Sequence, residues 1–152
     1  AMVPEGRRLF PSLTVEENLL MGACAGRAGP WSLQSVYALF PVLQERRASL
    51  GTMLSGGQQQ MVAVGRALMS NPRLLLCDEL SLGLAPIVVQ DIYRTLRTVT
   101  ASGVSLVVVE QDIRQAIAAS DHFVCLREGR VALAGAQGTA RREDIAQAYF
   151  GS

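Results

Sequence analysis

The chain has 152 residues, of which 49% are hydrophobic and 18% charged, so it can bury a core and we expect one globular unit or one large piece of a domain. The formal net charge of +1 and the lack of any run of basic residues argue against a nucleic-acid-binding surface. All 14 basic residues are arginine, so no segment can form a phosphate-binding loop of the GxxxxGK(S/T) type, which needs a lysine.

The first part of the chain predicts a loop followed by short helices. The opening segment contains two prolines, and Thr14 followed by Glu17 has the spacing of a capping box, which marks a helix start. After Gly29-Pro30 the pattern is less regular and indicates short helices and loops. Residues 12 to about 50 therefore predict a small helical subdomain.

The middle of the chain predicts a helix and then a buried strand. Ser55 with Gln58 forms a second capping box, and Asn71-Pro72 ends the helix that begins there. Residues 73–79 form a continuous apolar run that ends in two carboxylates. Such a run is typical of a strand that is buried on both faces of a parallel sheet.

The rest of the chain continues to alternate helices with strands. We expect, in chain order, a helix from Ala85-Pro86 to near Gly103, a strand over 104–110, a helix over 112–120, a hairpin over 122–135 that turns at Glu128-Gly129, and a helix from Thr139 to Phe150. This alternation predicts an α/β sheet with right-handed crossovers.

The cysteines and the single histidine suggest no metal site or disulfide. Cys24, Cys77 and Cys125 lie far apart without CxxC spacing, and two of them lie in apolar runs, so we expect reduced thiols packed in an interior. His122 begins a strand and is interpreted as structural. The apolar stretches are too short to span a bilayer and the N-terminus has no secretion pattern, so a soluble chain is expected.

Residues 54–60 read LSGGQQQ, the most specific motif in the sequence, and here the chain resembles the ATPase subunits of ABC transporters. Gly56 and Gly57 form the first turn of the helix that Ser55 caps, so its N–H groups are expected to face outward without side-chain cover, as an anion site. In that family this helix contacts the γ-phosphate of ATP bound to the opposite subunit. The resemblance implies that Ser55, Gly56, Gly57 and Gln58 bind nucleotide in trans; the alternative is an ordinary helix cap.

The strand that ends in Asp78 and Glu79 resembles the Walker B strand of the same family. The resemblance implies that Asp78 is the carboxylate on the Mg²⁺ side and that Glu79 polarises the attacking water as a catalytic residue. The alternative is two solvated acids after a strand. Leu80 stands where the family usually has proline, so the backbone that leaves Glu79 is expected to be less fixed.

Three further segments resemble family loops, and each points to the branch that imports branched-chain amino acids. Ser81, Leu82 and Gly83 fall at the D-loop, which contacts the other subunit of the dimer, and the run SLGLAP resembles that branch. Gln111 replaces the usual switch histidine as a second catalytic residue; it can donate a hydrogen bond to phosphate but cannot carry a positive charge. Glu5 stands where most members have the Q-loop glutamine, on the Mg²⁺ side through water.

The resemblance runs from the Q-loop to the end of the chain and implies an α/β fold, a partial P-loop NTPase (RecA-like) ABC ATPase core with a helical signature subdomain. The expected divisions are residues 1–11 as the Q-loop region, 12–60 as the helical subdomain with the signature motif, and 61–152 as the C-terminal part of the core. The segment that holds the phosphate-binding loop would precede Ala1.

The resemblance implies an ATP-binding and ATP-hydrolysing subunit fragment of an importer, with branched-chain amino acids as the expected cargo. ATP and Mg²⁺ are the implied cofactors, and the partners are a second ABC ATPase subunit and transmembrane permease subunits, which would hold it in the cytoplasm at the inner face of the cell membrane. Without the phosphate-binding loop the chain alone is expected to be inactive.

Two alternatives stay open beside the transporter subunit. One is a non-catalytic interaction or regulatory module derived from an ABC ATPase; the other, an ABC protein of DNA repair or translation, is disfavoured by the lack of basic patches. In P-loop ATPases the strand over 104–110 lies between the Walker B and Walker A strands. We therefore expect an exposed apolar sheet edge here, and a dimer or higher oligomer formed through it.

Overall fold

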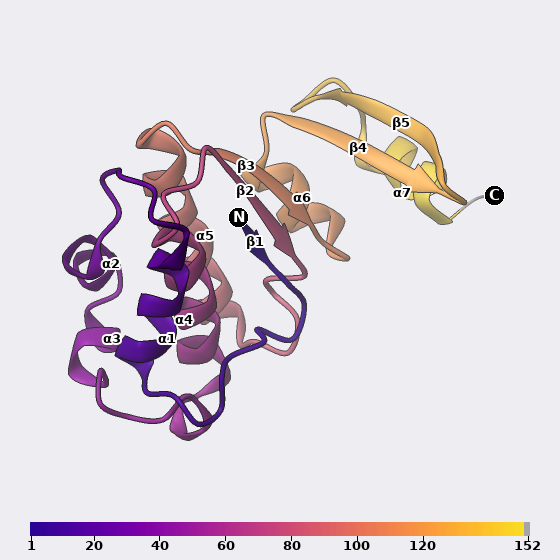
Figure 1. Cartoon of the computed structure of the whole chain (residues 1–152). Helices are drawn as coiled ribbons and strands as arrows, with labels where there is room; N and C mark the ends of the chain where they lie inside the picture. The colour runs from indigo at the N-terminus through magenta and orange to yellow at the C-terminus, as the bar shows by residue number, and fades with distance from the viewer. Residues whose placement is uncertain (151–152) are drawn as a thin grey trace. The chain divides into compact units, whose positions relative to one another are not determined.

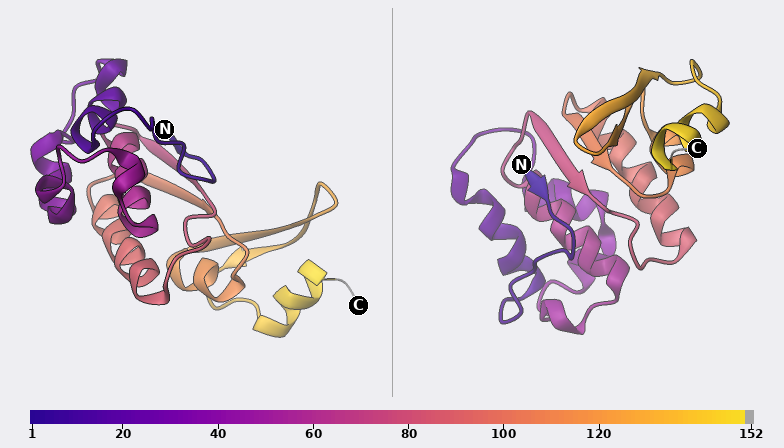
Figure 2. Two further views of the ribbon diagram at one scale, coloured as in Figure 1. Left: turned by 90° about the horizontal axis from the view of Figure 1, so that it is seen from below. Right: turned by 90° about the vertical axis from the view of Figure 1, so that its right-hand side faces the viewer.

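The computed structural model describes residues 1–150, apart from the side chains of residues 142, 149 and 150. The chain divides into two compact units, Ala1–Val109 and Glu110–Ser152 (Figure 1). The larger unit contains a small sheet and the helices that surround its core, and the smaller one contains a hairpin with two helices (Figure 2).

A parallel sheet lies in the first unit, as the alternating pattern predicts. Its strands are β1 (Met2–Val3), β2 (Leu74–Asp78) and β3 (Ser105–Val109), in the order β1-β2-β3. β2 and β3 pair along their whole length, with Cys77 opposite Val108. The short β1 falls in the segment that the sequence predicted to be all loop, because two residues are too few to show a strand pattern.

The prediction that β2 and β3 are buried on both faces is wrong. Leu75 and Cys77 are buried, but Leu74 and Leu76 between them are 43% and 38% exposed. Val109 on β3 is 56% exposed in the same alternating way. A continuous apolar run does not reveal how many faces of a sheet are covered, and here Leu74, Leu76 and Val109 remain exposed.

Helices pack on the other face of the sheet and around a common apolar core. They are α1 (Val15–Gly22), α2 (Leu33–Leu39), α3 (Pro41–Glu45), α4 (Gly56–Leu68) and α5 (Pro86–Ala101), with short 3-10 turns at Ala23–Ala25 (η1) and Gly51–Met53 (η2). Leu19, Leu43 and Leu68 are fully buried where these helices meet. Burying each such side chain contributes about 1.5–3 kcal/mol.

Both predicted capping boxes are present at the helix starts. At α1 the hydroxyl of Thr14 accepts from the amide of Glu17 at 3.2 Å, and a Glu17 oxygen accepts from the amide of Thr14 at 2.8 Å. Ser32 and Ser35 form the same reciprocal pair at α2, which the sequence analysis did not predict. These bonds satisfy N–H groups that have no partner within the helix itself.

The second unit contains α6 (Ile113–Ala119), the hairpin strands β4 (His122–Arg127) and β5 (Arg130–Ala136), and α7 (Arg142–Phe150). The hairpin turns where predicted: Glu128 and Gly129 have φ values of 51° and 74°. Two successive left-handed residues are typical of a type I′ turn, whose twist matches that of the strands. α7 begins after its predicted start, because Thr139 instead donates from its hydroxyl to the carbonyl of Ala136 at 2.7 Å.

The cysteines agree with the expected interior placement in two cases. Cys77 and Cys125 are buried and Cys24 is exposed, and all three are free thiols. His122 begins β4, as expected. Within residues 1–150, none of the helices has the length and apolar character that crossing a membrane requires.

Candidate nucleotide site

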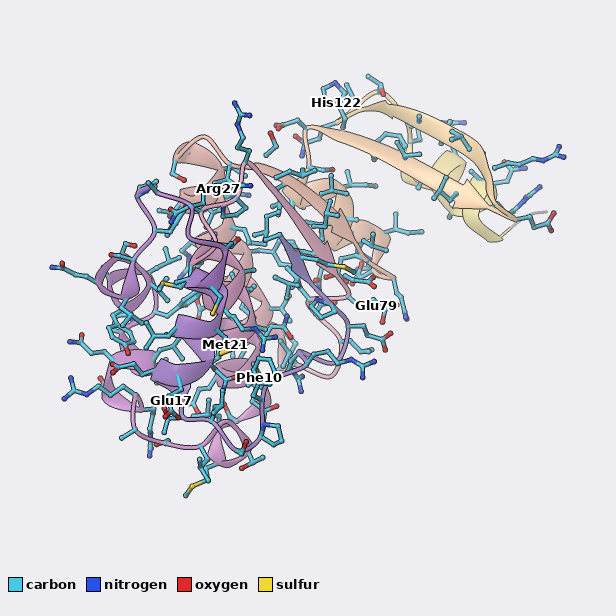
Figure 3. All side chains as sticks on the ribbon, viewed as in Figure 1. Phe10, Glu17, Met21, Arg27, Glu79 and His122 are labelled. Atoms are coloured by element: carbon cyan, nitrogen blue, oxygen red, sulfur yellow. The ribbon has the colours of Figure 1, made fainter. Side chains whose placement is uncertain are left out.

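The end of β2 carries the two predicted carboxylates, and the backbone changes conformation between them. Asp78 is the last residue of the strand, whereas Glu79, which Figure 3 labels, has a φ of 48° and so lies in the left-handed region. The amide of Glu79 donates to the carbonyl of Val109 at 2.9 Å and so continues the pairing with β3. A left-handed non-glycine residue costs about 1–2 kcal/mol, and such strain persists only where surrounding contacts impose it.

Leu80 shows how the backbone after Glu79 is held. Its side chain is only 1% exposed and belongs to the core of the first unit. The amide of Leu82 donates to the carbonyl of Glu79 at 3.3 Å, and that of Leu84 donates to the carbonyl of Ser81 at 3.1 Å. A buried leucine and a hydrogen-bonded turn thus hold the backbone that leaves Glu79, and the expectation that it is less fixed than with proline stays a prediction.

The signature helix α4 begins with the predicted cap. The amide of Gln58 donates to the hydroxyl of Ser55 at 3.3 Å, and the amide of Ser55 donates to the Gln58 side chain at 3.0 Å. The amides of Gly56 and Gly57 find no acceptor among the residues that the structure describes. Two unsatisfied donors at the positive end of a helix are the elements of an anion site.

The positions where a Cβ atom of each glycine would lie are occupied by neighbouring side chains, whereas the outward-facing amides stay a prediction. Gly57 is buried, and a Cβ atom added to it would lie 2.5 Å from Cγ1 of Val88 on α5. A Cβ atom on Gly56 would lie 3.3 Å from Nη2 of Arg7. The first turn of α4 therefore packs closely against its own chain, which gives the glycines a packing role in addition to any exposed amide.

Arg7 connects three segments at this site, and the sequence analysis missed it. Its Nε donates to Oε1 of Gln60 at 3.3 Å, and its Nη2 donates to the carbonyl of Leu82 at 3.4 Å. Its own carbonyl accepts from Nη2 of Arg66 at 3.1 Å. The only signal in the sequence is an arginine pair beside a glycine in the opening loop, which does not identify these distant partners.

The remaining predicted residues are more scattered. Glu5 is exposed in the opening loop, and Ser81, Leu82 and Gly83 form the turn after Glu79. Gln111 follows the boundary at Val109 and belongs to the second unit. The structure thus brings the opening loop, the start of α4 and the turn after β2 together within the first unit.

One carboxylate at the strand end is of the kind that Mg²⁺ takes from a protein. Mg²⁺ usually takes one or two carboxylates plus substrate phosphates and water, and Asp78 at the strand end supplies one such carboxylate. Over the described part of the chain, no group of three or more His, Cys, Asp or Glu side chains is placed to hold a metal ion.

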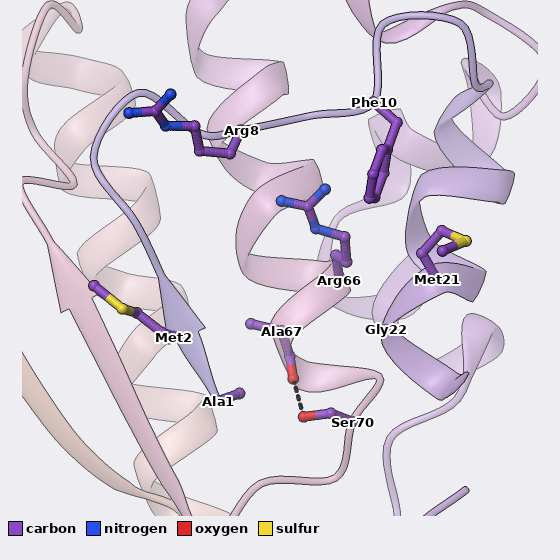
Figure 4. Close-up of a pocket in the computed structure, with 9 residues that line it drawn as sticks. All are labelled: Ala1, Met2, Arg8, Phe10, Met21, Gly22, Arg66, Ala67 and Ser70. Carbon is purple, nitrogen blue, oxygen red and sulfur yellow. Dashed lines mark hydrogen bonds between the residues drawn. The ribbon is translucent and has the colours of Figure 1, made fainter. Parts of the chain in front are cut away.

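A shallow pocket of about 330 Å³ lies between the opening loop, α1 and α4 (Figure 4). Arg66 lies over the ring of Phe10 at 5.3 Å, a cation–π contact, with Arg8 and Met21 nearby in the lining. Burial lowers the pKa of the Arg66 guanidinium from its ordinary value. Its Nη1 is buried and has no hydrogen-bond partner among the described residues.

Comparison with known proteins gives a consistent result. The ABC transporter family model matches residues 1–81. The high-affinity branched-chain amino acid transport ATP-binding protein BraG of Pseudomonas aeruginosa is 47% identical over 135 residues, which is 88% of this chain and 58% of that protein. The molybdenum import ATP-binding protein ModC of Granulibacter bethesdensis is 32% identical over 157 residues, which is 99% of this chain and 43% of that protein.

Solved structures show the same likeness. The dimeric post-hydrolysis structure of an ATP-binding cassette bound to ADP and Pi has a TM-score of 0.77 and 26% identity, covering 90% of this chain and 62% of that one. An ATP-binding subunit of an ABC transporter has a TM-score of 0.78 and 26% identity, covering 97% and 67%. This chain thus spans 58% and 43% of the two named curated relatives.

Proposed function

This chain belongs to the ABC transporter family, and from that membership we propose that it is part of the ATP-binding and ATP-hydrolysing subunit of an importer for branched-chain amino acids. The fold agrees with the expected α/β ABC ATPase core, because its structural neighbours are ATP-binding cassettes. The observation that carries the proposal is the intact LSGGQ helix, with its serine cap and two donor amides. The substrate class rests on the similarity to BraG and on the run SLGLAP.

In the proposed reaction two carboxylates have separate tasks. Glu79 orients the attacking water, and Asp78 holds the metal side of the site. Asp78 would hold Mg²⁺, which when bound would neutralise charge on the phosphates. The left-handed backbone at Glu79 supports this division, because the strand ends at Asp78 and Glu79 does not take the opposite-face position that strand alternation would give it.

The signature helix contributes to the nucleotide site of a second ATPase subunit. The amides of Gly56 and Gly57 face the terminal phosphate of that subunit's ATP, with Ser55 beside them. Ser81, Leu82 and Gly83 contact the same subunit. The dimeric ATP-binding cassettes among the structural neighbours support a paired arrangement, and permease subunits would place the pair at the inner face of the membrane.

A second candidate, the non-catalytic module, is favoured by one observation. The chain contains no lysine, so it cannot itself supply the ammonium that the terminal phosphates need. Such a module would act only in trans, through the signature helix. The two candidates share that helix, and they differ in whether Glu79 ever acts on nucleotide.

Both candidates require the signature helix to act on a second subunit. This is tested by mixing the chain with an intact ATPase subunit of a branched-chain amino acid importer and measuring phosphate release. We expect stimulation by the chain, and loss of stimulation with Ser55→Arg. Ser32→Arg is the matched control, because Ser32 caps α2 in the same way but lies outside the signature helix. Stimulation that is indifferent to Ser55→Arg would contradict the proposal.

A further inference from the structure

The opening loop adopts an unusual backbone at three successive residues. Gly6, Arg7 and Arg8 have φ values of 71°, 64° and 46°. For the two arginines this conformation is unfavourable, so the surrounding structure must hold it. The hydrogen bonds that stabilise this loop conformation are mainly those of Arg7.

The guanidinium of Arg7 joins two segments that lie far from it in sequence. It donates to Gln60, one turn into the signature helix, and to the carbonyl of Leu82 in the turn after Glu79. Gln60 is only 4% exposed, so its side-chain oxygen depends on a partner within the protein. Arg66 fixes the backbone of Arg7 from α4 at the same time.

The contact also reaches the first turn of the signature helix. A Cβ atom on Gly56 would lie 3.3 Å from Nη2 of Arg7 and 3.4 Å from Cδ2 of Leu84. Arg7 and Leu84 thus flank the residue whose amide is a free donor. Arg7 therefore contacts both the turn after Glu79 and the start of the helix.

We propose that Arg7 is a positioning residue that couples the opening loop to the signature helix and to the turn over residues 81–84. The inference rests on the proposed function, and it adds a specific residue through which movement of the loop reaches the helix and the turn. The donor–acceptor distances of 3.3 and 3.4 Å are slightly longer than is usual for N–H···O bonds. A displacement of a few tenths of an ångström therefore breaks them, which suits a contact that forms and releases.

The coupling is tested by amide hydrogen exchange on the chain alone. In Arg7→Ala the amides of Leu82 and Leu84 should exchange about tenfold faster, because the turn loses its hydrogen bond to a charged donor. Arg8→Ala is the matched control: it removes the neighbouring left-handed arginine, which lines the pocket, whereas the bonds to Gln60 and Leu82 come from Arg7. Wild-type exchange at both amides in folded Arg7→Ala, or the same acceleration in Arg8→Ala, overturns the proposal.

A second variant covers the case in which Arg7→Ala does not fold. Gln60→Met keeps the side-chain volume and removes the acceptor, so it should also accelerate exchange at Leu82 and Leu84. Arg7→Lys should give an intermediate rate, since an ammonium lacks the planar fork that serves two acceptors. Full restoration by lysine would show that charge alone matters and would contradict the geometric role.

A second experiment measures how strongly the chain stimulates phosphate release by an intact ATPase subunit. Arg7→Ala should reduce the stimulation about tenfold while the folded fraction, measured by circular dichroism, is unchanged. If the wild-type chain does not stimulate at all, the proposed function fails, whereas the exchange result on the chain alone still decides the role of Arg7. Undiminished stimulation by Arg7→Ala counts against the coupling.

Discussion

Gly57 and Val88 are in such close contact that any side chain at position 57 would overlap with the valine: an added Cβ atom would lie 2.5 Å from Cγ1. Val88 is β-branched and has little freedom to rotate away. We expect Gly57→Ala to lower the free energy of unfolding by about 1–3 kcal/mol, more than the helix propensity of alanine returns. Urea denaturation measures this, and Val88→Ala in the same chain should restore most of the loss.

The lack of lysine leads to a prediction about nucleotide binding. The isolated chain should give no saturable binding heat with MgATP up to about 1 mM and no phosphate release, because neither a lysine nor its loop of amide donors is present to hold the phosphates. Calorimetry and a phosphate assay test this. A micromolar dissociation constant with steady turnover that Glu79→Gln abolishes would refute it.

The free edge of β3 leads to a prediction about assembly. Among the described residues β3 pairs only with β2, and Val107 and Val109 are exposed on its open face. An apolar edge of this kind templates pairing with another chain. Light scattering at low micromolar concentration should therefore show a dimer or higher oligomer, and Val107→Lys should shift it toward monomer.

A monomer in solution would contradict the prediction of assembly through β3. A monodisperse monomer in which the amides of Val107 and Val109 exchange rapidly would show that the edge is neither paired nor covered in solution. Thr98→Lys on α5 serves as a control, because it adds the same charge at an exposed position away from the edge. It should leave the oligomer unchanged.

The capping box at α1 should make stability depend on pH. Hydrogen bonds from Thr14, first from its amide and then from its hydroxyl, lower the pKa of Glu17 below its ordinary value of 4.5. Because the folded state holds the lower pKa, this stabilisation is fully present above the unfolded pKa and is lost as pH falls through the folded pKa. The stability difference between wild type and Glu17→Gln should therefore be largest near neutral pH and disappear in acid, as denaturation curves at several pH values would show.

Local signals in the sequence predicted much of this fold. Thr14 with Glu17 and Ser55 with Gln58 mark helix starts because the capping partners are only three residues apart. The turn at Glu128-Gly129 is equally local. Each of these features depends on a short stretch of backbone, so the sequence contains all the information that is needed.

Contacts between distant segments could not be predicted in this way. Arg7 meets Gln60 and Leu82 across 53 and 75 residues. Asn18 is fully buried, and its side chain donates to the carbonyls of Phe10, Leu13 and Thr14, although a lone asparagine in a helix gives no sign of this. Similarly, the exposed face of β2 depends on which elements cover the sheet and not on the strand's own composition.

The backbone at Glu79 has a consequence for how sequences can vary at this position. With a φ of 48°, the site would suit glycine or asparagine better than glutamate, by about 1 kcal/mol. Neither replacement provides a carboxylate that can polarise water. Substitution by glycine or asparagine would thus give a more stable chain that cannot hydrolyse ATP. Selection for thermal stability and selection for turnover therefore favour different residues at position 79.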